Sequence, residues 1–314
     1  MDNITPVPPY FAAVVQVPLY GLNDREPERQ TMCRNAGRVV DIMDRIIALS
    51  DTAPKLIVLP VLCFIGIGTA MRLSGRQINI NVNDVAVDLN NDRLLDPILE
   101  ACARHGCYVV SSCVEKHPAM PGRYFHTGFV LGPKGLVLRS PKTQAPTSAG
   151  ITLIRDAYKE YVDAFGSEAI LPVAETPIGK IGCLVEGEFL VSEATRTLAR
   201  KGAEIIVHPT ATHYGPGNPP YTAIQQTLAY TNGVFWLSGV PSAEFVEMSD
   251  GRLAAEFGGG AAIVGPDGVI LGMVQGIHEG HATAKIDLVH LYAVRPELGR
   301  HTVPAEIVYR TLYQ

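Results

Sequence analysis

The spacing of apolar residues alternates between two periods along the chain. Residues 11–17 and 55–59 are short, nearly continuous apolar runs, which predict buried strands. The second run is typical of a strand whose sheet is covered on both faces. Residues 28–49 instead repeat apolar side chains at every third or fourth position, which predicts an amphipathic helix. A helix over 94–104 and a strand over 107–114 continue the series, so the pattern predicts an α/β fold.

Two short sequences recur in the second half of the chain. Residues 56–60, Leu-Ile-Val-Leu-Pro, resemble residues 205–209, Ile-Ile-Val-His-Pro. Residues 130–135 resemble residues 264–268, where Gly-Pro and a later glycine join two predicted strands. No linker-like stretch separates the two parts. We therefore expect two pseudo-repeated halves packed as one domain.

Composition excludes two classes of partner. The net charge is −5, the pI is near 6.0 and no run of Lys or Arg is present, so we expect no nucleic-acid partner. The longest apolar runs are strand-sized, far short of a membrane span, so we expect no membrane partner. Residues 1–10 lack the basic start of a signal peptide. The six cysteines form no CxxC pair, which fits reduced thiols, and together these features predict a cytoplasmic protein.

A series of motifs spans nearly the whole chain. In order, they are Gln16, residues 56–60, Gly66, residues 132–135, Lys142, residues 176–182, Glu193, Arg196, residues 202–206, Asn232, residues 257–261, residues 265–268 and residues 285–287. With this order and spacing, the chain resembles the nitrilase (carbon–nitrogen hydrolase) superfamily. The resemblance implies a single domain over residues 1–314, with a core of about 11–300 and a tail of 301–314.

The resemblance also implies an architecture and an assembly. The expected fold is a nitrilase-like αββα sandwich, which becomes a four-layer αββα–αββα unit when two subunits pair through helices. We therefore expect a homodimer or a higher homo-oligomer. In this family, an acyl group forms a thioester on a cysteine. A glutamate acts as base, a lysine binds the oxyanion and a second glutamate supports them.

The family's site residues map unevenly onto this sequence. Lys142 matches the lysine, but the place of the base glutamate, after Pro60, holds Val61. The place of the cysteine, four residues after Gly182, holds Glu186, and the acidic residue that often follows is kept as Glu188. The supporting glutamate falls in a variable stretch. Its candidates are Glu160 and, less favoured, Glu168.

Neither nearby cysteine restores the ordinary nucleophile. Cys183 lies three positions before Glu186 and points to the opposite strand face, so we interpret it as a packed thiol. Cys63 follows Val61 by two residues and could share its side of the chain, although a packed role is again favoured. The usual thioester route is therefore absent from the expected site.

Several chemistries stay open for the remodelled pocket. Lys142 between the carboxylates of Glu186 and Glu160 would form an acid/base pair for hydration, elimination or hydrolysis of a small polar substrate. The alternative is a pseudoenzyme in which a buried Lys–Glu pair fills a dead site, while the protein binds a small-molecule ligand or a protein partner. A third reading makes Val61 and Glu186 engineered changes in a normal amidase.

Other polar residues are expected at the pocket mouth. His126, His208 and His213 could line it, and His208 precedes Pro209 at a strand end. No acidic or cysteine partner stands at a spacing suited to a metal, so we expect a polar lining, no metal and no cofactor.

Overall fold

The computed structural model describes residues 7–68, 72, 74–76, 80–144, 150–212 and 220–299. The strands are β1 (Tyr10–Tyr20), β2 (Leu56–Val58), β3 (Tyr108–Lys116), β4 (Tyr124–Gly132), β5 (Gly135–Pro141), β6 (Val173–Thr176), β7 (Gly179–Cys183), β8 (Ile205–Pro209), β9 (Phe235–Met248), β10 (Gly251–Glu256), β11 (Ala262–Val264), β12 (Ile270–Met273) and β13 (Gly280–Ile286). The helices are α1 (Glu28–Leu49), α3 (Val82–Val85), α4 (Asp96–His105), α5 (Tyr158–Phe165), α6 (Ser192–Arg200), α7 (Tyr221–Asn232) and α8 (Leu288–Gly299). The predicted tail, 301–314, lies outside the described residues.

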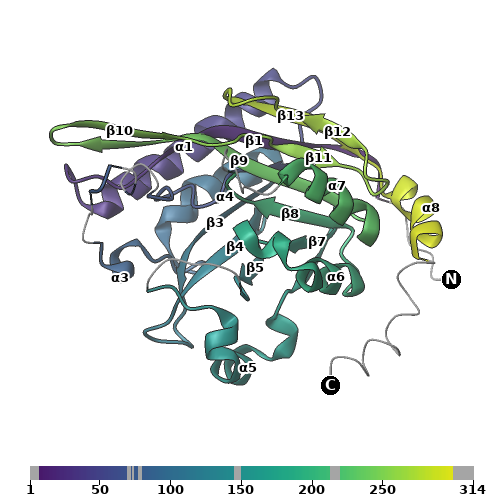
Figure 1. The fold of residues 1–314 in the computed structure, drawn as a ribbon, viewed down its shortest axis with the longest axis horizontal. Coiled ribbons are helices and arrows are strands. Elements are labelled where there is room, and N and C mark those ends of the chain that lie inside the picture. Colours follow the sequence, from purple (N-terminus) through teal and green to yellow (C-terminus); the bar gives the residue numbers. More distant parts are fainter. Residues whose placement is uncertain are drawn as a thin grey trace.

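Strand β9 belongs to two sheets at once. Its first residues pair in parallel with β8 and its later residues pair in parallel with β1, with His208 opposite Ser238 and Gln16 opposite Val240. The path of neighbouring strands is β5-β4-β3-β2-β1-β9-β8-β7-β6. We call the part from β5 to β1 the first sheet and the part from β8 to β6, with β11 and β12, the second sheet. The two sheets therefore share one long strand (Figure 1).

Alternating residues of these strands face different apolar layers. Ala12 and Val14 of β1 point between the two sheets, whereas Ala13 and Val15 point to the layer under α1 and α4. On the second sheet, Val207 faces the first sheet; its neighbour Ile206 faces the layer under α6 and α7. Three apolar layers thus separate helix, sheet, sheet and helix, and the predicted αββα sandwich is confirmed.

The strand and helix predictions hold with small shifts of their ends. Residues 56–60 and 205–209, the first recurring pair, contain β2 and β8, short strands with parallel neighbours in the first and second sheets. The predicted helices over 28–49 and 94–104 are α1 and α4. In the described part of the chain, no helix is long and apolar enough to cross a membrane.

Candidate functional site

Lys142, Glu186 and His208 converge where strands of both sheets end. Lys142 follows β5, and Glu186 begins a 3₁₀ turn (Glu186–Leu190) shortly after β7. His208 lies near the end of β8, which runs parallel to β7. The Ser140 hydroxyl donates to the Cys183 carbonyl oxygen (2.9 Å) and joins the two sheets beside this point. In α/β proteins, ligands usually bind at the carboxyl ends of the strands.

Lys142 and Glu186 form a close ion pair. The Lys142 Nζ lies 2.8 Å from the Glu186 Oε2, so the predicted proximity of the two residues is confirmed. The Lys142 side chain is 1% exposed and that of Glu186 is 25% exposed. Burial alone would raise the pKa of Glu186, but the charge of His126 when that ring is protonated and the Lys142 ammonium outweigh burial and lower it. Glu186 is therefore ionised near neutral pH.

Glu186 stands at a strained backbone position. Its φ is +47°, a left-handed conformation that residues other than glycine seldom adopt. His208 holds this turn, because its ring Nε2 lies 2.7 Å from the Glu186 carbonyl oxygen. A strained non-glycine residue persists only where its surroundings fix it, and such residues cluster at functional sites.

A chain of hydrogen bonds behind His208 sets the tautomer of that ring. The indole N–H of Trp236 donates to Ser238 Oγ (2.8 Å), which lies 3.2 Å from His208 Nδ1. The Glu186 carbonyl oxygen can only accept a hydrogen bond, so Nε2 carries the hydrogen and donates to it. In this tautomer Nδ1 accepts from the Ser238 hydroxyl. Burial lowers the pKa of His208 to about 4, so the ring is neutral. These hydrogen bonds hold the main chain of Glu186 in place from the second sheet.

His126 approaches the same carboxylate from the first sheet. Its Nδ1 lies 3.5 Å from Glu186 Oε2, and its Nε2 lies 2.9 Å from Ser112 Oγ. Burial lowers the pKa of His126 to about 4, and this ring is neutral as well. The Ser112 oxygen also accepts the main-chain N–H of Leu62 (2.9 Å). The site thus holds one ammonium, one carboxylate and two neutral imidazoles.

Glu188 ties together the two segments that carry the ion pair. Its Oε1 accepts the main-chain N–H and the hydroxyl of Thr143, both at 2.7 Å, and its Oε2 accepts the N–H of Val185 at 3.1 Å. Burial raises the pKa of Glu188, and these hydrogen bonds oppose the rise. Glu188 therefore braces the pair from behind.

The predicted supporting glutamates lie elsewhere. Glu160, on α5, is 58% exposed and pairs with Arg123 at 2.7 Å on the surface. Glu168 is 91% exposed and pairs with Lys201 at 3.3 Å. Helix α5 extends away from both sheets (Figure 1). The prediction that either residue shares a cavity with Lys142 is wrong, because both carboxylates are exposed and pair with other cations at the surface.

Val61 and Cys63 face opposite layers. Val61 is buried between the two sheets, in the same cluster as Val185. Cys63 belongs to the layer under α1, because Leu62 between them has a φ of +49° and breaks the simple alternation. Cys63 therefore does not share the side of Val61, and its burial agrees with the favoured packed role. Burial also raises the pKa of the Cys63 thiol to about 12.

Cys183 is a packing residue, as predicted. It is fully buried, and a Cβ added to Gly128 would lie only 2.5 Å from its Sγ. Gly128 lets the sheets approach closely at this point. His213 lies outside the described residues, and no cluster of His, Cys, Asp and Glu suited to a metal ion occurs among the residues described.

Sequence reasoning missed the residues that orient the site. They are the hydrogen-bond partners of His126 (Ser112), Glu188 (Thr143) and His208 (Ser238), together with Trp236, which donates to Ser238. The available signal was a hydroxyl within an otherwise apolar strand, since a buried hydroxyl needs a partner. Ser112 and Ser238 both show it.

Comparison with known proteins agrees with this architecture. The family model for carbon–nitrogen hydrolases matches residues 11–296, and the chain belongs to that family. Omega-amidase NIT2-B of Xenopus laevis is 23% identical over 210 residues, which cover 65% of this chain and 69% of that protein. A nitrilase of Pyrococcus abyssi is 24% identical over 248 residues, covering 78% and 80%.

Solved structures show the same fold. Nit3 of Saccharomyces cerevisiae superposes with a TM-score of 0.64 at 17% identity, covering 94% of each chain. An amidase from Nesterenkonia sp. superposes with a TM-score of 0.61 at 19% identity, covering 93% of this chain and 95% of that one.

Proposed function

We propose that this protein catalyses acid/base chemistry on a small polar substrate without a thioester intermediate. Hydration, elimination and hydrolysis are the reactions that this site suits. The supporting observation is the 2.8 Å ion pair of Lys142 with Glu186 at a strained turn. The motif spacing aligns Glu186 with the family's nucleophile. In this proposal, Glu186 takes a proton and Lys142 binds the negative charge that develops on the substrate.

Glu186 suits the role of a base. It is ionised, and a quarter of its side chain is exposed, so a small molecule can reach it. The buried Lys142 contributes a fixed positive charge where little water competes. The neutral His126 ring, 3.5 Å away, is a second group that can exchange a proton with substrate.

A relocated thioester finds no support among the nearby cysteines. Cys183 is sealed between the sheets, and Cys63 faces the layer under α1. Val61, at the place of the base glutamate, cannot accept a proton. These residues favour a chemistry that does not depend on a thiolate.

The relatives suggest the substrate class. Two of them are named as an omega-amidase and a nitrilase, and a mutant of the Nesterenkonia amidase was solved with butyramide. A small amide, nitrile or carbonyl compound has an atom on which negative charge develops, which Lys142 would bind. We therefore propose an uncharged molecule of this kind as substrate.

We also propose that the protein is cytoplasmic and works as a homodimer or larger homo-oligomer, paired through helices. Exposed apolar side chains on α7, at β12 and on α8 support this assembly. They are Tyr230, Val269, Leu271, Val289 and Tyr292. Sedimentation analysis tests the assembly, and a monomer at micromolar concentration would contradict it.

The variant Glu186→Gln tests the proposed reaction. It keeps the shape of the side chain but removes the base, so turnover in a screen of small amides, nitriles and carbonyl compounds should fall by roughly 10² or more. Glu160→Gln is the matched control, since that glutamate pairs with Arg123 at the surface, and its turnover should not change. A Glu186→Gln protein that melts lower, with no turnover in the parent protein, would indicate a structural plug instead.

A further inference from the structure

A cavity of about 200 Å³ lies between the end of β1 and helix α1. It forms because β2 pairs only with Ala12–Val14, while β1 continues to Tyr20. Pro18 has no N–H to donate, and the register against β9 shifts at this residue. Beyond the end of β2, the turn around Pro60 and side chains of α1 fill the gap incompletely.

This cavity is separate from the Glu186 site. Val39, Leu59 and Cys63 line it, and all three belong to the apolar layer under α1. Val61 and Val185, beside the Glu186 site, belong to the layer between the sheets. The first sheet therefore separates the two.

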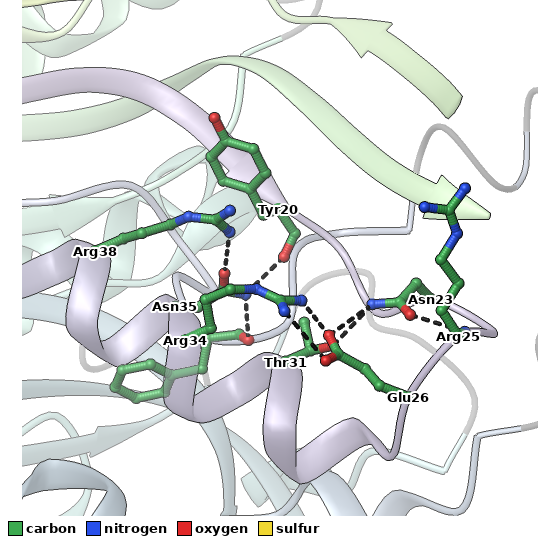
Figure 2. Close-up of polar contacts among 9 residues, drawn as sticks. Tyr20, Asn23, Arg25, Glu26, Thr31, Arg34, Asn35 and Arg38 are labelled. Atoms are coloured by element: carbon green, nitrogen blue, oxygen red, sulfur yellow. Dashed lines mark hydrogen bonds and ion pairs between the residues drawn. The ribbon is translucent and has the colours of Figure 1, made fainter. Parts of the chain in front are cut away.

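A preorganised guanidinium forms one wall of the cavity. Arg38 stacks over the ring of Tyr20, 3.5 Å from its centroid, and its Nη1 donates to Asn35 Oδ1 (2.7 Å). Asn35 is itself buried, and its amide donates to the main-chain oxygens of Tyr20 (2.7 Å) and Phe64 (2.8 Å). Figure 2 shows Arg38 held in this way beside Tyr20. The contact with Asn35 occupies one of five guanidinium N–H groups.

An unpaired acid stands next to this guanidinium on the same helix. Asp41 follows Arg38 by three residues, lines the cavity and is exposed at its mouth. Within the described part of the chain, no ion pair engages the Asp41 carboxylate. The other two charges of the lining, Arg45 and Glu279, face one another at 3.7 Å. One cation and one anion thus remain for a ligand.

We propose that this cavity binds a short amino acid in its zwitterionic form. The carboxylate pairs with the planar fork of Arg38, and the ammonium group points to Asp41. The carbon chain lies against Leu59 and Ile42, which supply apolar walls. A concave apolar site with a few fixed polar groups is the usual form of a small-molecule pocket.

Isothermal titration of the full-length protein with 4-aminobutanoate and with glycine tests the proposal, with butanoate and butylamine as single-charge probes. At least one amino acid should bind at one site per chain, more tightly than either single-charge probe. Arg38→Gln should weaken this binding at least about tenfold, since a charge-assisted hydrogen bond is lost. Arg38→Lys, which keeps the charge but not the fork, should give an intermediate affinity. Asp41→Asn should weaken binding of the amino acid but not that of butanoate.

Arg252→Gln is the matched control. Arg252 also stacks on an aromatic ring, that of Phe245 at 3.9 Å, but it does not line the cavity. Its replacement should leave the affinity within about twofold, since its partners Phe245 and Glu247 do not line the cavity either. Absence of saturable binding, or equal affinity in Arg38→Gln, would overturn the proposal. So would loss of binding in Glu186→Gln with full binding in Arg38→Gln, because the probe would then occupy the other site.

Discussion

The His208 ring donates its Nε2–H to the main-chain carbonyl oxygen of Glu186 across 2.7 Å. This bond links β8 to the turn that holds the proposed base. It acts on the main chain of Glu186 and leaves its carboxylate to Lys142 and His126. We therefore regard His208 as a positioning residue.

Replacing His208 tests that role. His208→Leu should lower the free energy of unfolding by about 1–3 kcal/mol, because the Glu186 carbonyl and Ser238 lose their buried partner. Turnover should fall as well, since the carboxylate moves away from Lys142. His208→Gln, which can still donate an N–H, should restore part of both. Denaturant unfolding and kinetics measure the two effects. The expected loss of unfolding free energy with unchanged turnover would contradict the positioning role.

The two buried imidazoles predict a pH dependence of stability. The pKa values of His126 and His208 are lowered from 6.5 to about 4, so the unfolded chain binds protons before the folded one does. Their stabilising contribution is complete above pH 6.5 and is lost as the pH falls from 6.5 toward 4, by up to about 3 kcal/mol for each histidine. The lowered pKa of Glu186 adds a further loss in acid below its ordinary range.

Urea unfolding between pH 7 and pH 4.5 measures this effect. The slope of stability against pH should decrease in His126→Gln and should not change in His290→Gln, since the His290 side chain is half exposed. A flat profile in the parent protein would show that the two rings are not held neutral.

Part of this site follows from the sequence alone. The motif order placed Lys142 and Glu186 together, because each follows a strand whose place in the fold is fixed by its apolar pattern. The supporting glutamate could not be placed in the same way. Glu160 lies on α5, which packs through Tyr161 against Met120 and Phe125, far from it in the chain. The side of the chain on which Cys63 lies could not be predicted, because the positive φ of Leu62 interrupts the alternation of sides.

The cysteines give a prediction about reactivity. Cys33 is exposed, whereas the other five are buried, so a thiol-alkylating reagent should add rapidly to Cys33 alone. Activity should survive, and Cys33→Ser should abolish the fast labelling. Intact-mass analysis with substrate should show no thioester. An acyl adduct on Cys63 would overturn the proposed chemistry and identify a relocated nucleophile.

The last prediction concerns Val61 and Glu186, which the motif spacing aligns with the family's base glutamate and cysteine. Val61→Glu together with Glu186→Cys would supply the base and the nucleophile, with Lys142 already in place. We expect the native activity to be lost, because Glu186 is its proposed base. Weak amidase activity should appear, with an acyl adduct on the new cysteine when butyramide is added.

The single variants separate these contributions. Glu186→Cys alone lacks the base, so its acyl adduct should form about 10²-fold more slowly than in the double variant. Val61→Glu alone places a carboxyl group at a fully buried position between the sheets, and should cost about 1–3 kcal/mol of stability. Time-resolved intact-mass measurements follow the adduct, and thermal melting follows the fold. Equal rates of acylation with and without Glu at position 61 would show that this position does not face the reacting group. Val61 would then be a packing residue only.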